Sequence, residues 1–308
     1  MTPDPRAHDR AEDRAEERAE DLARAWAAQR GRLVGVAYAV LGSRAEAEDV
    51  VADCWLSLVA ADARDPVRDV EAWATVAVAR RALDVLRSAR VRREAYVGPW
   101  LPEPIVGDDP ATAAPDPADR VTLDDRVSYA LMVVLETLSP AERTAWVLHD
   151  LFGLPFPAVA EAVGRTPAAV RQLAVRARAH VTSGAARVEV DRREQRRVAE
   201  AFLAAAGGGD LAALVAVLDP DAVLTSDGGG VVSAARRPVR GADDVARFVL
   251  GIGRRVRAGD VVRPATVNGG PGLVATRDGV TFLVAALTVG GGRVTRVDLV
   301  LAPDKLPR

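Results

Sequence analysis

The residues best suited to chemistry are arginines gathered in one segment, residues 163–182, which contains no acidic residue. Arg side chains hydrogen-bond guanine edges and neutralise phosphates, and Gln side chains pair with adenine edges. The segment has helical spacing, so one face presents these groups together. The pattern therefore predicts major-groove contacts from Arg171 and Gln172, and phosphate contacts from Arg176 and Arg178.

Two helices joined by a tight turn are predicted to position this face, over residues 156–175. The small Ala160 allows the helices to touch, and Gly164, four residues later, tolerates the positive φ that the turn needs. Thr166 is suited to N-cap the second helix, and Pro167 follows at the first helical position, where a missing N–H costs nothing. Capping, turn and charge agree, and so favour a DNA-binding helix-turn-helix over a helical hairpin with a solvated basic face.

A second basic element lies at residues 71–94, where the arginines of residues 80–93 are accompanied by one acid, Asp84. Apolar residues form an inner stripe and leave most of the arginines outside. Such a helix, with aromatic residues nearby, could hold a melted DNA strand by phosphate contacts and base stacking. An ordinary solvated face is the alternative. The arginines are Arg80, Arg81, Arg87, Arg90, Arg92 and Arg93.

A helix with an acidic face is predicted after Ser43. Ser43 and Glu46 have the spacing of a capping box, which marks the start of a helix. Apolar residues line one side of this helix and acidic residues lie largely on the other. Residues 9–95 are therefore predicted to form a three-helix unit. The acidic side carries Glu46, Glu48, Asp49 and Asp53.

The segment that follows has the composition of an extended acidic linker. Residues 99–117 contain six prolines, and residues 101–126 contain seven acids against two arginines. A compact domain seldom tolerates so many prolines. The predicted linker joins the two basic elements, and could allow them to contact separated sites on DNA.

After a basic connector at residues 183–197, hydrophobic alternation and Gly-rich turns replace the helical pattern. Alternation with a period of two predicts strands, and short Gly turns predict hairpins. The sequence therefore predicts an α+β domain with helices packed on a curved antiparallel sheet. The predicted helices are 198–206, 210–218 and 242–255, and the predicted strands are 222–225, 260–268, 271–277, 280–289 and 293–301.

The length of 308 residues favours about two domains, and the net charge of −2 by itself does not indicate a nucleic-acid binder. Cys54 is the only cysteine, which excludes an internal disulfide and fits a reducing cytosol. No apolar run has the length of a membrane span, and the charged N-terminus lacks the apolar segment of a signal peptide. We therefore expect a cytoplasmic protein with no metal, no cofactor and no membrane partner.

With these features the chain resembles bacterial extracytoplasmic-function sigma factors, and more closely the SigJ-like branch with a fused SnoaL-like (NTF2-like) C-terminal domain. Residues 41–58 are similar to the region 2 helix of this family, which docks on the β′ clamp of RNA polymerase. Residues 71–94 look like its −10 region. Residues 138–181 resemble its region 4, which reads the −35 promoter element.

Three short motifs narrow the resemblance to this branch. They are WLPEP at 100–104, DGGG at 227–230 and APDKL at 302–306. Ala302 departs from the Asn with which the last motif begins in the family, and Val231 stands where a basic residue is common. Both departures lie in motifs to which the resemblance assigns regulatory contacts, and they do not affect the family resemblance.

The resemblance implies a role for four sets of residues. For the set that would contact core polymerase, which is mostly acidic, the alternative interpretation is an ordinary solvated face. The −35 contacts are Thr166, Arg171, Gln172, Arg176 and Arg178. The −10 contacts are Arg80, Arg81, Arg87 and Arg90. The contacts to core polymerase are Glu48, Asp49, Asp53 and Trp55. The regulatory interdomain contacts are Trp100, Leu101, Pro102, Asp227, Gly228, Gly229, Gly230, Asp304 and Lys305.

The expected fold is therefore multi-domain, with two all-α sigma domains (a region 2 helical unit and a region 4 helix-turn-helix) plus an α+β NTF2-like cone. The resemblance implies a sigma factor that binds promoter DNA and core RNA polymerase, at the β′ clamp and the β flap. It also implies regulation in cis by the C-terminal domain. The expected boundaries are 1–98 for region 2, 99–119 for the linker, 120–183 for region 4, 184–197 for the connector and 198–308 for the C-terminal domain.

Two other function classes stay open: a one-component DNA-binding regulator, and a DNA-tethered SnoaL-like enzyme, neither of which binds core polymerase. SnoaL-type cyclases resemble this fold and use acid/base groups, typically including His and Asp. None of the three histidines, His8, His149 and His180, lies beyond residue 180. A carboxylate alone, Asp227 or Asp298, could still act if burial raised its pKa. We expect no enzyme, and leave open a small-molecule ligand of the cone.

Overall fold

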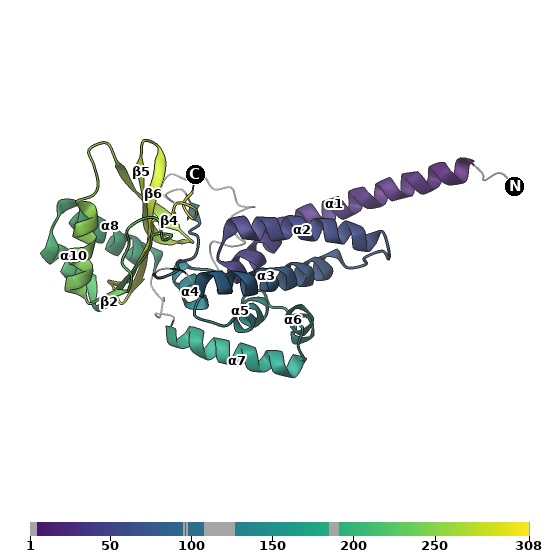
Figure 1. Ribbon diagram of the computed structural model, residues 1–308, viewed down its shortest axis with the longest axis horizontal. Coiled ribbons are helices and arrows are strands. Elements are labelled where there is room, and N and C mark those ends of the chain that lie inside the picture. The colour runs from purple at the N-terminus through teal and green to yellow at the C-terminus, as the bar shows by residue number, and fades with distance from the viewer. Residues whose placement is uncertain (1–4, 95, 97, 108–126, 185–190, 308) are drawn as a thin grey trace. The chain divides into compact units, whose positions relative to one another are not determined.

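The computed structural model describes residues 5–94, 96, 98–107, 127–184 and 191–307 (Figure 1). These residues divide into two compact units. The first unit holds the described residues up to Leu86 together with Thr144–Ala174, and the second holds the described residues of Arg87–Arg143 and Val175–Arg308. None of the described helices combines the length and apolar character that a membrane span requires.

Three long helices open the chain and confirm the helical elements predicted for residues 9–95. They are α1 (Pro5–Leu41), α2 (Arg44–Asp62) and α3 (Val70–Glu94). Helix α1 packs against α2. Ser43 is the N-cap of α2, because its hydroxyl accepts a hydrogen bond from the N–H of Glu46 at 3.3 Å. The apolar side of α2 is buried, through Ala47, Val50, Val51, Cys54 and Leu58.

Five shorter elements follow between residues 129 and 184, and they include the predicted helix-turn-helix. Pro140, Gly153–Pro155 and Gly164 lie at the boundaries between these elements. One turn was not predicted: the N–H of Phe152 bonds to the carbonyl of Val147, five residues back, in a π-helix. The elements are α4 (Tyr129–Leu135), α5 (Pro140–Trp146), η1 (Val147–Leu151), α6 (Phe156–Val163) and α7 (Pro167–Gly184).

The C-terminal domain is α+β, with three helices and a seven-stranded sheet of order β1-β4-β5-β6-β7-β2-β3 (Figure 1). Consecutive hairpins join β4 to β7, as the Gly-containing turns predict. The helices are α8 (Arg192–Gly208), α9 (Leu211–Val217) and α10 (Ala242–Gly253). The strands are β1 (Val106–Gly107), β2 (Leu218–Asp227), β3 (Val239–Arg240), β4 (Val261–Val267), β5 (Gly270–Arg277), β6 (Val280–Gly290) and β7 (Arg293–Val300).

The sheet is mixed, which corrects the prediction of an antiparallel one. Strand β2 runs parallel to β7, whereas its pairing with β3 is antiparallel. A hairpin turn forces an antiparallel pair, but β2 and β7 are far apart in sequence, so no turn constrains their direction. Only the strands that hairpins connect could be oriented from the sequence.

Two segments expected to be connections take part in regular structure. The connector expected at 184–197 ends early, because helix α8 begins at Arg192, where the Asp191 side chain caps the N–H of Arg193 at 3.2 Å. Within the expected linker, Val106 pairs with Val267 as strand β1 at the edge of the sheet. The rest of that linker, residues 108–119, lies outside the described residues.

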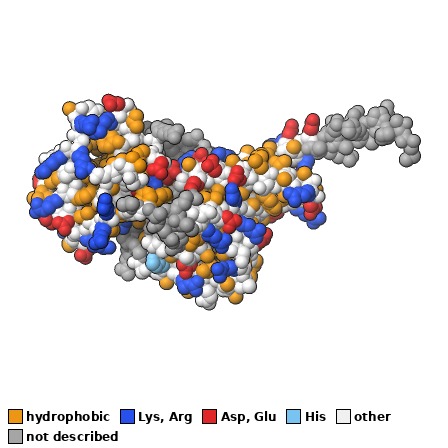
Figure 2. All heavy atoms as spheres, viewed as in Figure 1, with side chains coloured by type: hydrophobic (Ala, Val, Ile, Leu, Met, Phe, Trp, Pro, Cys, Tyr) orange, Lys and Arg blue, Asp and Glu red, His pale blue; other side chains and the backbone are white. Residues whose placement is uncertain are grey.

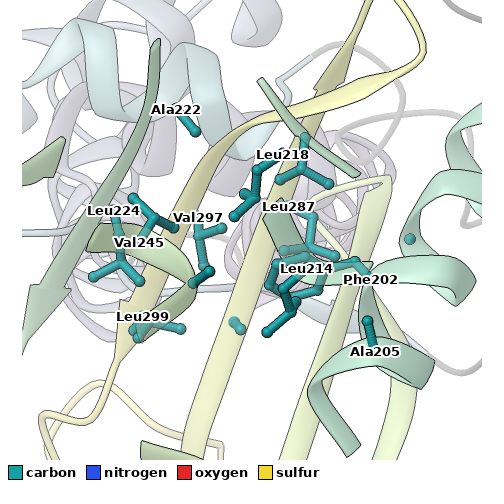
Figure 3. Packing of buried hydrophobic residues seen from close by; sticks show 14 of the residues in the cluster. Phe202, Ala205, Leu214, Leu218, Ala222, Leu224, Val245, Leu287, Val297 and Leu299 are labelled. Carbon is teal, nitrogen blue, oxygen red and sulfur yellow. The ribbon is translucent and has the colours of Figure 1, made fainter. Parts of the chain in front are cut away.

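Apolar residues cover both faces of the sheet. On one face the strands pack against α8, α9 and α10, as Figure 3 shows for Phe202, Leu214, Val245 and Leu299. On the other face a smaller cluster forms around Val274, Val284 and Ala286. Leu101 of the expected linker and Tyr129 of α4 belong to this second cluster. Leu101 is therefore part of the domain core.

Candidate functional site

The turn of the helix-turn-helix has the geometry that its sequence predicts. Gly164 has a φ of 71°, and its N–H bonds to the carbonyl of Ala160 at 2.9 Å, which ends α6. The Thr166 hydroxyl accepts a hydrogen bond from the N–H of Ala169 at 3.3 Å, so Thr166 caps α7. Buried Val159 and Val170 lie on the inner sides of the two helices.

The predicted −35 residues lie on the exposed side of this motif. The Arg171 guanidinium lies 5.2 Å from the ring centroid of Phe156, and the Arg176 side chain forms an ion pair with Glu142 at 2.9 Å. The pKa of Glu142 is lowered by the Ser139 hydroxyl first and by Arg176 next. The contact with the Phe156 ring orients Arg171, and the ion pair with Glu142 orients Arg176. The exposed set is Thr166, Arg171, Gln172, Arg176 and Arg178.

The predicted −10 residues on α3 have protein partners in this structure. An Arg80 guanidinium N–H donates to the carbonyl of Glu161 in α6 at 2.9 Å. Arg81 forms an ion pair with Asp53 of α2 at 3.0 Å. Arg87 is exposed, and the side chain of Arg90 lies outside the described residues. The structure therefore brings Arg80 and Arg81 to different helices, not to a shared site.

The predicted polymerase-binding face of α2 is only partly a solvated acidic surface. Asp49 is exposed, but Glu48 pairs with Arg44 at 3.1 Å, and Asp53 pairs with Arg81. The ring of Trp55 lies 5.6 Å from that of Trp26, between centroids.

Two apolar side chains on the same helix were not singled out from the sequence. Leu56 is 68% exposed and Val59 is 43% exposed. Their spacing of three residues places them on one side of the helix and was the available signal. On the buried side of α2, burial raises the pKa of the Cys54 thiol to about 11, with a further contribution from Asp53, so this thiol stays protonated at neutral pH.

A buried cluster of polar contacts joins the WLPEP segment, the DGGG turn and the C-terminal segment. We call Tyr96, Trp100, Leu101, Asp227 and Lys305 the linker-binding cluster. The Asp227 carboxylate accepts hydrogen bonds from the N–H of Leu101 at 2.8 Å, the Lys305 ammonium at 2.7 Å and the Tyr96 hydroxyl. Asp227 and Lys305 are 0% and 5% exposed at their side chains. A buried ion pair thus holds the linker backbone.

Lys305 contacts the linker in two further ways. Its ammonium donates to the carbonyl of Leu101 at 2.8 Å, and lies 3.0 Å from the ring centroid of Trp100. Tyr96 packs edge-on against Trp100, with centroids 5.3 Å apart. A cation on an aromatic face is attracted by the ring quadrupole, and more strongly when water is excluded. The same ammonium therefore satisfies a carboxylate, a backbone carbonyl and an aromatic ring.

The cluster shifts the titration of its acidic members. For Asp227, burial is the largest single influence and acts to raise the pKa, but the charge of Lys305, with hydrogen bonds from Lys305, Tyr96 and Leu101, outweighs it, so the pKa is lowered. Burial, followed by the hydrogen bond to Asp227, raises the pKa of Tyr96. At neutral pH the cluster therefore contains a carboxylate and a phenol that donates to it.

Two glycines of the DGGG turn, Gly228 and Gly229, are required by close packing. A side chain at Gly228 would collide with the carbonyl of Val232, since a Cβ there would lie 1.9 Å from that oxygen. Gly229 has a φ of 69°, and its N–H donates to Asp227 at 2.9 Å. A Cβ at Gly229 would also lie 3.1 Å from that of Ala302. The turn is thus packed against the C-terminal segment.

The remaining predicted regulatory residues differ in burial. Pro102 is buried, and its carbonyl accepts a hydrogen bond from the hydroxyl of Tyr129 at 2.8 Å. Gly230 has a φ of 72° and open space where a Cβ would lie. Asp304 is exposed.

Sequence reasoning missed two residues that hold the linker. Asn268, in the turn between β4 and β5, accepts a hydrogen bond from the N–H of Ile105 at 2.9 Å through its side chain. The backbone N–H of Asn268 donates in return to the carbonyl of Ile105 at 2.8 Å. Tyr129 is the second. The Asn-Gly pair indicated only a turn, and nothing in the sequence connected it with residue 105.

Two family models match the chain, that of sigma-70 region 2 over residues 25–92 and that of sigma-70 region 4 over residues 128–181. The ECF RNA polymerase sigma factor SigJ of Mycobacterium tuberculosis (strain ATCC 25618 / H37Rv) is 41% identical over 288 residues, which cover 90% of this chain and 91% of that protein. The probable ECF RNA polymerase sigma factor SigI of the CDC 1551 / Oshkosh strain is 35% identical over 92% of this chain and 94% of that protein.

A solved structure is similar over nearly the same length. The crystal structure of Mycobacterium tuberculosis extracytoplasmic function sigma factor SigJ superposes with a TM-score of 0.73 at 37% identity, covering 92% of this chain and 97% of that one. The helices of residues 25–92, together with the helix-turn-helix within residues 128–181, therefore define a protein of the sigma-70 class. Within that class, the chain belongs to the extracytoplasmic-function RNA polymerase sigma factors, in the SigJ-like branch.

Proposed function

We propose that this chain directs core RNA polymerase to specific promoters, and that its C-terminal domain sets this activity in cis by binding the linker. Membership of the sigma factor family supports the first part. The second part rests on one observation, the buried Asp227–Lys305 pair that holds the backbone of Leu101. A partner of core polymerase works in the cytoplasm, where the lone Cys54 stays reduced.

Promoter recognition is assigned to two helices. Helix α7 presents Arg171 and Gln172 to base edges of the −35 element, and Arg176 and Arg178 to phosphates. The short residues at the start of α7 support this assignment, because they let the helix approach the groove closely. Helix α3 serves the −10 element through its arginines, of which Arg80 and Arg81 must first leave Glu161 and Asp53. The Arg81–Asp53 ion pair and the hydrogen bond of Arg80 to the Glu161 carbonyl are both exposed, and an exposed ion pair contributes little, so DNA phosphates can replace these partners.

Core polymerase binding is assigned to helix α2 for the β′ clamp and to the region 4 helices for the β flap. The acidic residues Glu48, Asp49 and Asp53 supply charge, and Trp55 supplies apolar area. The exposed Leu56 and Val59 strengthen the assignment, since apolar side chains carry much of the affinity of a protein interface.

Regulation in cis follows from chain connectivity. The linker that the C-terminal domain binds is the same segment that joins the two predicted DNA-binding domains. Six residue steps separate Glu94, at the end of α3, from Trp100, a reach of at most roughly 20 Å. A tethered contact acts at high effective concentration, so it persists without a large interface. Holding residues 100–107 therefore limits how far the end of α3 can move from the C-terminal domain.

A SnoaL-like enzyme is the less favoured alternative. A cavity lies between the helices and the sheet of the C-terminal domain, and none of its lining residues, all in the described part of the chain, is Asp, Glu, His or Cys. Neither candidate carboxylate is among them: Asp227 is bound to Lys305, and Asp298 is buried beside Arg296. Acid/base chemistry on a ligand in this cavity would lack a titrating group. We propose that the domain is regulatory and not catalytic.

The discriminating experiment is co-purification with core RNA polymerase followed by run-off transcription. A sigma factor binds core enzyme and yields promoter-dependent transcripts. A one-component regulator or a tethered enzyme binds DNA without core enzyme and yields none.

Regulation in cis is tested separately, by deleting residues 198–308. The truncation should change promoter activity sharply, because the linker loses its partner. Equal activity of the truncated and full-length proteins with core polymerase would show that the C-terminal domain does not regulate.

A further inference from the structure

The cavity of the C-terminal domain has a volume of about 1780 Å³ and largely apolar walls. Helices α8 and α10 and strands β4 to β6 contribute most of the lining. Several large apolar side chains in it are only half-buried, although they sit beside the domain core shown in Figure 3. These are Leu203, Phe248, Leu250, Ile252, Leu273 and Phe282.

Half-buried side chains of this kind leave apolar surface in contact with water. Each square ångström of such surface that a ligand covers contributes about 25 cal/mol. Binding cavities in proteins are typically apolar, with a few polar groups that fix the orientation of the ligand. The walls therefore favour an extended apolar group over a polar metabolite.

The charged residues of the lining have a single sign. Six arginines line the cavity, and the described lining residues include no acid. Two of the six are paired, Arg247 with Asp243 and Arg277 with Asp260. Figure 2 shows Arg side chains beside apolar ones at the left end of the molecule, on the side of α10. The other four are exposed and make no ion pair within the described residues: Arg254, Arg255, Arg257 and Arg263.

We propose that this cavity binds one long-chain acyl anion, with the chain against the apolar walls and the anionic head at the arginines of residues 254–263. Arg forms charge-assisted, often bidentate hydrogen bonds with carboxylate and phosphate groups. A free fatty acid and a phosphate-headed single-chain lipid share this chemistry. A cationic molecule lacks the anionic head, and a short-chain molecule lacks the long apolar chain.

The cavity adjoins the linker-binding cluster through consecutive residues of two segments. In β2, Ser226 lines the cavity while Asp227 binds the linker. In the C-terminal segment, Leu306 lines the cavity while Lys305 binds the linker. A ligand that displaces either segment therefore also displaces the contacts of Trp100, which lies against Lys305. Control of transcription by the ligand rests on the proposed function, whereas binding does not.

Isothermal titration calorimetry of the full chain with dodecanoate tests the binding site. We expect one molecule bound per chain, and affinity reduced about tenfold or more by the double variant Arg254→Gln, Arg257→Gln, because each charge-assisted contact contributes substantially. The matched control, Arg193→Gln with Arg196→Gln, removes the same charge from exposed positions on α8 outside the lining and should bind normally. Ala206→Phe, which fills part of the cavity, should also weaken binding.

Three probes then define the ligand class. Dodecyl phosphate binding more tightly than dodecanoate indicates a phosphate-headed lipid, and the reverse indicates a free fatty acid. Dodecyltrimethylammonium should bind much more weakly than either. The proposal is overturned if dodecanoate does not bind, or if many molecules bind per chain as in detergent adsorption. It is also overturned if the cationic probe binds as tightly as the anionic ones, or if the control variant loses as much affinity as the Arg254→Gln, Arg257→Gln variant.

Discussion

Lys305 is the only lysine in a chain with 41 basic residues, and its side chain is almost completely buried. Taking an ammonium and a carboxylate out of water is costly, so the Asp227–Lys305 pair is not explained by stability alone. Its geometry instead specifies one position of the linker, since Lys305 and Asp227 together bind both the N–H and the carbonyl of Leu101. The pair is best understood as a determinant of where the linker lies.

Removing one partner of this pair should be far more costly than removing both. Lys305→Met leaves the Asp227 carboxylate buried without its cation, and should lower the free energy of unfolding of the C-terminal domain by roughly 3–5 kcal/mol. The double variant Lys305→Met, Asp227→Asn should recover part of that loss. Urea denaturation followed by tryptophan fluorescence measures both.

Arg193→Met is the control for the change of residue type, because Arg193 is exposed. It should leave the denaturation curve nearly unchanged. If Lys305→Met had as small an effect as this control, the buried pair would not hold the linker.

The lowered pKa of Asp227 gives a pH dependence of definite sign. Because the folded pKa lies below the unfolded value of about 3.9, the stability that Asp227 contributes is present above that value and is lost as pH falls through the folded pKa. The difference in Tm between the wild type and Asp227→Asn should therefore shrink below about pH 4. Thermal unfolding followed by circular dichroism at a series of pH values measures it. A difference that stays constant across the acid range would contradict this account.

At the scale of elements, helix α7 carries the assignment of −35 recognition. Arg171→Ala with Arg176→Ala should reduce the affinity of the polymerase-bound protein for −35 DNA by about 30-fold or more, since each base or phosphate contact contributes on the order of 1–3 kcal/mol. Fluorescence anisotropy at physiological salt measures the affinity. Arg193→Ala with Arg196→Ala removes equal charge from α8 and should change it little. Unchanged binding by the α7 variant would refute the assignment.

In the β4–β5 turn, Asn268 holds the linker through both its side chain and its backbone N–H, and the side-chain contact can be removed without backbone strain. Asn268 has a φ of 46°, a conformation that Gly adopts freely, so Asn268→Gly removes mainly the acceptor of the Ile105 N–H. Hydrogen exchange at the Ile105 amide should accelerate about tenfold, as expected for a lost hydrogen bond of roughly 1.4 kcal/mol. Native-state exchange followed by NMR measures it.

Asp278→Gly provides the matched control, because Asp278 has a φ of 50° in the β5–β6 turn and is exposed. Exchange at Ile105 should not change in this variant. Acceleration in both variants, or in neither, would mean that the Asn268 side chain does not secure the linker.

How much of these elements could be predicted depends on how local their causes are. The turn at Gly164 and the cap at Thr166 arise from neighbouring residues, and the sequence predicts both. The pairing of Asn268 with Ile105 joins residues far apart in the chain, and no local signal indicates it. The six prolines predict an extended linker, and the described residues 99–105 are not helical, but the prolines could not reveal that Leu101 is buried in the core of another domain.

At the scale of the whole molecule, the net charge of −2 is a cancellation between separate elements. Basic side chains lie on α3, on α7 and around the cavity of the C-terminal domain, and acidic ones lie on α2 and in the linker region. We propose a different partner for each block: DNA or an anionic ligand for the basic blocks, and polymerase for the acidic helix. Local charge therefore indicates function where the total does not.

The proposal of regulation in cis joins these parts, because the linker-binding cluster connects the C-terminal domain to the segment between the DNA-binding domains. Its most direct test is run-off transcription by core RNA polymerase with equal amounts of wild type, Lys305→Met and Arg193→Met, on promoters isolated with the reconstituted holoenzyme. The account predicts promoter-dependent transcripts whose yield changes several-fold in Lys305→Met and is unchanged in Arg193→Met. Equal yields from all three proteins, or no transcript beyond that of core enzyme alone, would contradict it.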